Sequence, residues 1–122
     1  MAEVIVIGED HEQMRRLIVD ALAAEGYDIR EAADTQSVLD QVAKARPAVL
    51  ILDVHMPGEG GIAALRKIRA DPALRGTRVL LLSGSVEALD ADWATEVGAD
   101  DHLPKPFQVA ELREKVRALV AG

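Results

Sequence analysis

Charged and hydroxyl side chains follow four of the short apolar runs in this sequence. They are Glu9 and Asp10, Asp53, Ser83 and Lys105. Carboxylates gathered at one place repel one another unless a cation is bound among them. Mg²⁺ is suited to this, because it prefers carboxylate and carbonyl oxygens and leaves coordination positions for phosphate. A lysine and a hydroxyl can bind a phosphoryl group, and a carboxylate can accept one as an acyl phosphate.

The apolar runs are predicted to be strands. They lie at 4–7, 27–30, 48–52 and 79–82, with a weaker run at 102–103. Three of these runs are apolar at consecutive positions, which is typical of strands covered on both faces in a parallel sheet. The run at 27–30 alternates between apolar and polar residues, so we place it at an edge of the sheet.

Segments with helical periodicity follow each of the runs. Their apolar faces lie within 14–22, 38–42, 62–68 and 109–119, and a weaker segment covers 86–97. Regular alternation of strands and helices predicts an α/β fold, a doubly wound parallel sheet with helices on both faces. Such folds bind ligands beyond the carboxyl ends of their strands, where the charged residues stand.

The composition excludes several classes of protein. The chain has 122 residues, 49% hydrophobic and 29% charged, which suits one domain over residues 1–122 with its own core. A net charge of −7 argues against direct contact with nucleic acid. The absence of cysteine excludes thiolate metal sites, and no apolar run approaches the about 20 residues of a membrane helix. We therefore expect a cytoplasmic protein without a membrane partner.

Over essentially its whole length the sequence resembles the receiver domain of two-component response regulators. The resemblance rests on Glu9-Asp10, on the run 53–58, on Ser83-Gly84 and on the run 98–107, which occur in order at the expected strand ends. It implies a flavodoxin-like (βα)5 fold with strand order 2-1-3-4-5. It also implies a signalling switch and not a conventional enzyme. Such a switch catalyses only its own phosphotransfer and autodephosphorylation.

The resemblance assigns the phosphoryl chemistry to three side chains. Asp53 would accept a phosphoryl group from a phosphohistidine on a sensor histidine kinase or a phosphotransfer protein. Ser83 would bind the phosphoryl oxygens through its hydroxyl, and Lys105 would neutralise their charge. The Lys105–Pro106 peptide bond is expected to be cis, as is usual in the family.

The resemblance also implies a Mg²⁺ cofactor. Asp10 and Asp53 would hold the cation together with the backbone carbonyl of His55. Glu9 would reach it mainly through water. A single imidazole among carboxylates favours Mg²⁺ over a transition metal, by the hardness of the ligands.

The sequence departs from the usual receiver pattern at the residue three before the lysine. In the family this residue is commonly Tyr or Phe, and it forms the conformational switch together with the hydroxyl residue, here Ser83. Here it is His102, a smaller polar ring that can be charged near neutral pH. We hypothesise that His102 couples weakly to Ser83 or signals through a hydrogen bond. His55 and Ser85 stand at the positions that modulate hydrolysis of the acyl phosphate in the family.

Each of these side chains also has a purely structural interpretation. Asp10 could cap the following helix, with Gln13 in the capping-box position. Asp53 could simply begin a turn, and Ser83 could be a turn or cap residue. Lys105 could be an ordinary surface lysine. The coincidence of all of them at strand ends favours the functional interpretation.

Two features outside the strand ends have structural interpretations as well. Trp93 is the only tryptophan, and its place beside apolar neighbours favours packing in the core over contact with a partner. Arg66, Lys67 and Arg69 lie on a predicted helix and are most simply explained as facing solvent.

Other functions on the same sheet are less consistent with the residues present. A degenerate receiver, used as a phosphorylation-independent scaffold, would not need intact Asp10, Asp53, Ser83 and Lys105. A phosphatase with an aspartate nucleophile would have a second carboxylate where His55 stands.

As a switch, the chain would signal to an unidentified output partner through the fourth helix, fifth strand and fifth helix, with a homodimer possible through that face.

Overall fold

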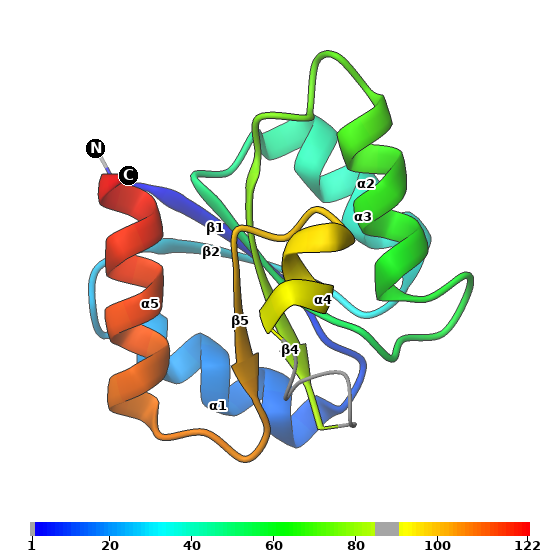
Figure 1. The fold of residues 1–122 in the computed structure, drawn as a ribbon. Helices are drawn as coiled ribbons and strands as arrows, with labels where there is room; N and C mark the ends of the chain where they lie inside the picture. The colour runs from blue at the N-terminus through cyan, green and yellow to red at the C-terminus, as the bar shows by residue number, and fades with distance from the viewer. Residues whose placement is uncertain (1, 85–90) are drawn as a thin grey trace.

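The computed structural model describes residues 2–84 and 91–122, which form a parallel sheet between two layers of helices (Figure 1). The strands are β1 Val4–Gly8, β2 Asp28–Ala32, β3 Val49–Asp53, β4 Arg78–Ser83 and β5 Asp101–Pro104. The helices are α1 Glu12–Ala23, α2 Thr35–Ala45, α3 Gly61–Ala70, α4 Ala91–Glu96 and α5 Val109–Ala121. None of the helices in these two ranges is long and apolar enough to span a membrane.

The strand order is β2-β1-β3-β4-β5, and all neighbouring pairs are parallel. This confirms the predicted fold and places the alternating strand β2 at an edge. The register aligns the carboxyl ends of the central strands, with Gly8 opposite Leu52 and Asp53 opposite Leu82. Residues that end or follow these strands therefore meet at one edge of the sheet.

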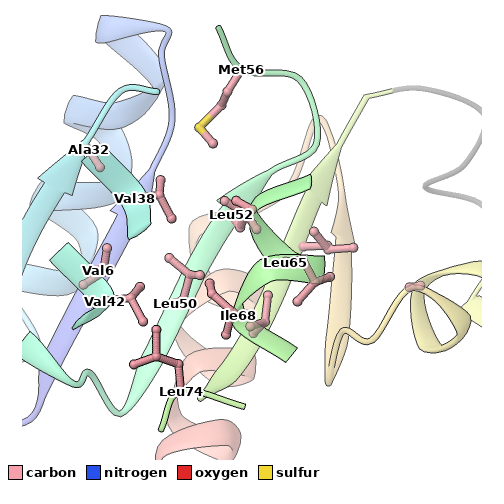
Figure 2. Close-up of a cluster of buried hydrophobic side chains, with 14 residues drawn as sticks. Val6, Ala32, Val38, Val42, Leu50, Leu52, Met56, Leu65, Ile68 and Leu74 are labelled. Atoms are coloured by element: carbon pink, nitrogen blue, oxygen red, sulfur yellow. The ribbon is translucent and has the colours of Figure 1, made fainter. Parts of the chain in front are cut away.

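Buried apolar side chains form one layer on each face of the sheet. Figure 2 shows the layer against α2 and α3, which includes Val6, Leu50, Leu52, Val38, Val42, Leu65 and Ile68. The opposite layer, against α1 and α5, includes Ile5, Ile7, Ile51, Ile18, Leu22, Leu112 and Val116. Successive residues of a central strand enter opposite layers, which explains the consecutive apolar residues. Trp93 packs against the first layer, as predicted.

The N-termini of α1, α2 and α5 carry side-chain caps; that of α5 is Glu111, whose Oε1 accepts the Gln108 N–H at 3.1 Å. Helix α2 begins with a capping box formed by Asp34 and Ser37. Helix α1 is capped by His11, whose Nδ1 accepts the backbone N–H of Met14 at 3.3 Å. The capping role considered for Asp10 is therefore wrong, because the helix begins one residue later than that role requires.

The described part of the fourth helix is shorter than the predicted segment 86–97, since α4 covers Ala91–Glu96. Residues 85–90, and with them Ser85, lie outside the described residues. Beyond α4, Gly98 has a φ of 102°, a backbone conformation that favours glycine. This glycine follows the end of the helix, where the chain turns towards β5.

The three basic residues on α3 do not share one environment. Arg66 and Lys67 are exposed, as predicted, whereas Arg69 is half-buried. Its guanidinium donates hydrogen bonds of 2.6 to 3.0 Å to the carbonyls of Gly98, Arg75 and Thr77 and to the Asp100 carboxylate. The solvent-facing prediction fails because the side chain is long enough to bring its guanidinium to four acceptors in the loops before β4 and β5.

Replacing Arg69 with Lys is expected to lower the free energy of unfolding by about 1–3 kcal/mol, because one ammonium cannot serve four acceptors in two loops. Urea unfolding followed by circular dichroism measures the change. The control is Arg66→Lys on the same helix, for which a change below about 0.5 kcal/mol is expected. Equal effects of the two variants would contradict the role of Arg69.

Candidate functional site

The carboxyl ends of the strands bring together most of the residues singled out in the sequence. Glu9 and Asp10 follow β1, Asp53 ends β3, Ser83 ends β4 and Lys105 follows β5. Carboxylate oxygens of Glu9, Asp10 and Asp53 lie within 4.8 Å of one another. The cleft above them has a volume of about 460 Å³ and is lined by Glu9, Asp10, His11, Met14, Asp53, His55, Gly84 and Lys105.

Lys105 is the cation that pairs with the buried acids. Its Nζ donates hydrogen bonds to Glu9 Oε1 at 2.9 Å and to Asp53 Oδ2 at 3.1 Å. Its backbone N–H donates to the carbonyl of Ser83 at 2.9 Å, and the Lys105–Pro106 peptide bond is cis, as expected. Lys105 is thus held in the site and is not an ordinary surface lysine.

Asp53 is buried, with 6% of its surface exposed. Its Oδ1 accepts the backbone N–H of His55 at 3.1 Å, so the carboxylate also shapes the start of the following loop. Gly61, the first residue of α3, lies against its backbone, and a Cβ added there would be 2.0 Å from the Asp53 carbonyl oxygen. Only glycine lets the helix begin this close to Asp53.

Burial and neighbouring charges shift the pKa values of the three buried ionisable groups in different directions. Burial, together with the neighbouring Asp53 carboxylate, raises the pKa of Glu9 to about 8. Burial by itself would raise the pKa of Asp53, but interactions with Glu9, the His55 N–H and Lys105 lower it below its ordinary value. Burial opposes the charge of Lys105, yet Glu9 and Asp53 raise its pKa, so the ammonium stays charged.

The donor set fits a hard divalent cation. Glu9 is fully buried, and within the described part of the chain its Oε2 has no hydrogen-bond partner. An unpaired buried carboxylate oxygen is costly, and a cation bound beside it would remove that cost. Since Asp10 is exposed at the mouth of the cleft, the carboxylates extend from the interior to solvent.

The remaining candidates lie around this cluster. Ser83 is buried at the end of β4, and His55 is exposed on the wall of the cleft. His102 is half-buried on β5 and does not line the cleft. Its backbone N–H donates to Asp101 Oδ1 at 2.8 Å, and its Nδ1 lies 3.9 Å from the same oxygen.

Sequence reasoning missed one arginine that supports the site. Arg15 on α1 donates from Nη1 to the backbone carbonyl of Glu9 at 2.9 Å and from Nε to Glu31 Oε1 at 3.0 Å. It therefore links the β1–α1 loop to the end of β2. Nothing in the spacing of Arg15 could indicate this role, because its partner in the site is a backbone atom.

Comparison with known proteins agrees with this geometry. The sequence profile of the response regulator receiver domain matches residues 5–117, and the chain belongs to that family. Response regulator MprA of Mycobacterium avium is 37% identical over 120 residues, which cover 95% of this chain and 50% of MprA. The chain spans about half the length of the curated relatives it matches.

Solved receiver domains have the same architecture. The receiver domain of a signal transduction histidine kinase from Syntrophus aciditrophicus has a TM-score of 0.89 and 30% identity, over 99% of this chain and 92% of that one. The receiver domain of sensor histidine kinase PA1611 from Pseudomonas aeruginosa has a TM-score of 0.90 and 24% identity over the full length of both chains. That structure contains a magnesium ion coordinated in its active site cleft.

The raised pKa of Glu9 predicts a pH-dependent stability. In the unfolded chain Glu9 ionises near its ordinary pKa of 4.5, whereas in the fold it keeps its proton up to about pH 8. Its contribution to stability is therefore present below pH 4.5 and is lost progressively as the pH rises to about 8. Glu9→Gln removes this loss, so the variant is expected to gain stability relative to the parent protein across that window.

Urea unfolding in the presence of EDTA, at about pH 5 and about pH 8, measures the difference between the two proteins. The control is Glu96→Gln, a matched change at an exposed glutamate of α4, which should alter the free energy of unfolding by less than about 0.5 kcal/mol. A difference for Glu9→Gln that stays constant between the two pH values would show that the buried carboxyl does not titrate as stated.

Proposed function

We propose that this chain is a phosphorylation-controlled switch in which Asp53 accepts a phosphoryl group from a phosphohistidine. The donor is a sensor histidine kinase or a phosphotransfer protein in the cytoplasm, and a phosphoacceptor role is general to the receiver family. The observation that carries the proposal is the buried Asp53 carboxylate, held 3.1 Å from Lys105 Nζ in an open cleft. Its lowered pKa keeps the nucleophile ionised at neutral pH.

We further propose that Glu9, Asp10, Asp53 and the backbone carbonyl of His55 hold Mg²⁺. The unpartnered Glu9 Oε2 and the carboxylate oxygens within 4.8 Å of one another support this assignment. The magnesium ion in the PA1611 receiver domain is consistent with it. When bound, the cation would offset negative charge on the carboxylate and phosphoryl oxygens.

The transfer itself uses one oxygen of Asp53. That oxygen attacks phosphorus opposite the histidine nitrogen; a P–O bond forms, the P–N bond breaks, and the imidazole leaves with the electron pair and binds a proton. Lys105 stays beside the phosphoryl oxygens as their counter-charge, and the Ser83 hydroxyl donates a hydrogen bond to them. Buried surroundings strengthen both interactions.

The later steps of the switch rest on residues around the cleft. We assign modulation of hydrolysis to His55, which stands on the cleft wall, and to Ser85. The output surface would be α4-β5-α5, with His102 as the switch residue on β5 and a homodimer as one possible outcome. The output partner or domain is unidentified, and the net charge of −7 argues against direct contact with nucleic acid.

Intact-mass spectrometry after incubation with acetyl phosphate and Mg²⁺ tests the proposed phosphoacceptor. The parent protein is expected to gain a single phosphoryl group that hydroxylamine removes, as it does from acyl phosphates. Asp53→Asn should gain none, and EDTA should suppress the reaction. The matched control is Asp101→Asn on β5, outside the cleft, which should be phosphorylated normally.

Two results would overturn the assignment. A stable adduct in Asp53→Asn would place the acceptor elsewhere in the chain. If the parent protein gains no adduct from acetyl phosphate or from a sensor kinase phosphohistidine, the result would favour a scaffold that works without phosphorylation.

A further inference from the structure

Thr35, the first residue of α2, is a buried polar residue outside the carboxylate cluster, with 4% of its surface exposed. Its Oγ1 accepts the backbone N–H of Gly60 at 2.9 Å. The hydroxyl proton has two carbonyl acceptors, Gly60 at 3.2 Å and Pro57 at 3.3 Å. The backbone N–H of Thr35 also donates to the Pro57 carbonyl, at 3.2 Å.

These contacts reach the loop 54–60, which joins Asp53 to α3. The loop is folded around the threonine: Gly58 and Gly60 have φ values of 90° and 92°, and a Cβ on Gly58 would lie 3.1 Å from Thr35 Oγ1. In the described ranges, two other side chains from outside the loop bond to it: Asp53, whose Oδ1 accepts the His55 N–H, and Lys67, which pairs with the exposed Glu59. Such an exposed ion pair contributes little.

Helix α2 does not need the hydroxyl of Thr35 for its own stability. Its N-terminus is capped by Asp34, whose Oδ1 accepts the Ser37 N–H at 2.8 Å, and Val38 and Val42 bury its apolar face. The hydrogen bonds of the Thr35 hydroxyl all go to the loop. The side chain therefore acts on the geometry of the loop, not on the helix that carries it.

We propose that Thr35 is a positioning residue for the cation site: it fixes the loop 54–60 and thereby the His55 carbonyl that would face the cation. This inference rests on the proposed function. His55 is bonded to Asp53 Oδ1 through its N–H, so displacement of the loop would move a cation ligand and the support of the acceptor carboxylate together. Thr35 itself touches neither the phosphoryl group nor the cation.

The test compares Thr35→Val, which keeps the shape and removes the hydroxyl, with Thr35→Ser, which keeps the hydroxyl. Mn²⁺ affinity, measured by electron paramagnetic resonance of the free ion, is expected to fall about five- to tenfold in Thr35→Val, the equivalent of one hydrogen bond. Thr35→Ser should stay within about twofold of the parent protein.

Phosphorylation by acetyl phosphate gives a second readout. The Mg²⁺ concentration for half-maximal rate should rise by the same factor in Thr35→Val, while the rate at saturating Mg²⁺ stays within about twofold. Hydrogen exchange at the Gly60 amide should accelerate in this variant, because its acceptor is lost.

Val42→Ala, in the core of the same helix, is the control for general destabilisation. An equal loss of Mn²⁺ affinity in Val42→Ala, or an unchanged affinity in Thr35→Val, would overturn the role of Thr35 and leave the proposed function standing. Failure of the parent protein to bind Mn²⁺ would overturn both the proposed cation site and this inference.

Discussion

The interaction on which the site depends is the contact of one lysine with two buried carboxylates. Glu9 and Asp53 are both removed from solvent, and Lys105 is the ammonium that bonds to both. One positive charge cannot balance two carboxylates and the nearby Asp10, and burial makes the imbalance costly. The pKa of Glu9 is raised for this reason, because a bound proton neutralises its carboxylate as a second cation could.

The sheet makes this arrangement possible, and backbone contacts refine it. Parallel strands place residues far apart in the chain at one edge, so β1, β3 and β5 deliver the two acids and the lysine. Arg15 then holds the Glu9 carbonyl, Gly61 lets α3 approach the Asp53 carbonyl, and Thr35 holds the loop that begins at Val54. Each of these residues acts on the main chain of a neighbouring segment.

Some site residues are placed by the strands, whereas others act through contacts with the backbone. This difference explains how much could be predicted from the sequence. Consecutive apolar residues predicted the central strands, and alternation predicted that β2 lies at an edge. The polar residues at the strand ends predicted that Glu9, Asp53 and Lys105 lie together. The roles of Arg15, Thr35 and Arg69 could not be predicted, because most of their partners are backbone atoms, which carry no signature of residue type. The cap of α1 differed from the capping role considered for Asp10 by a single position, which periodicity cannot resolve.

The two ends of the sheet are held by different sets of contacts. At the amino ends of β4 and β5, the guanidinium of Arg69 joins two loops through four acceptors, and Asp100 also accepts the Val79 N–H at 2.7 Å. At the carboxyl ends, the loop after β3 depends on the hydroxyl and amide of Thr35. A change of charge at Asp53 therefore acts first on Lys105 and on the loop after β3, which both bond to its carboxylate, while the amino ends and the two apolar layers keep the sheet fixed.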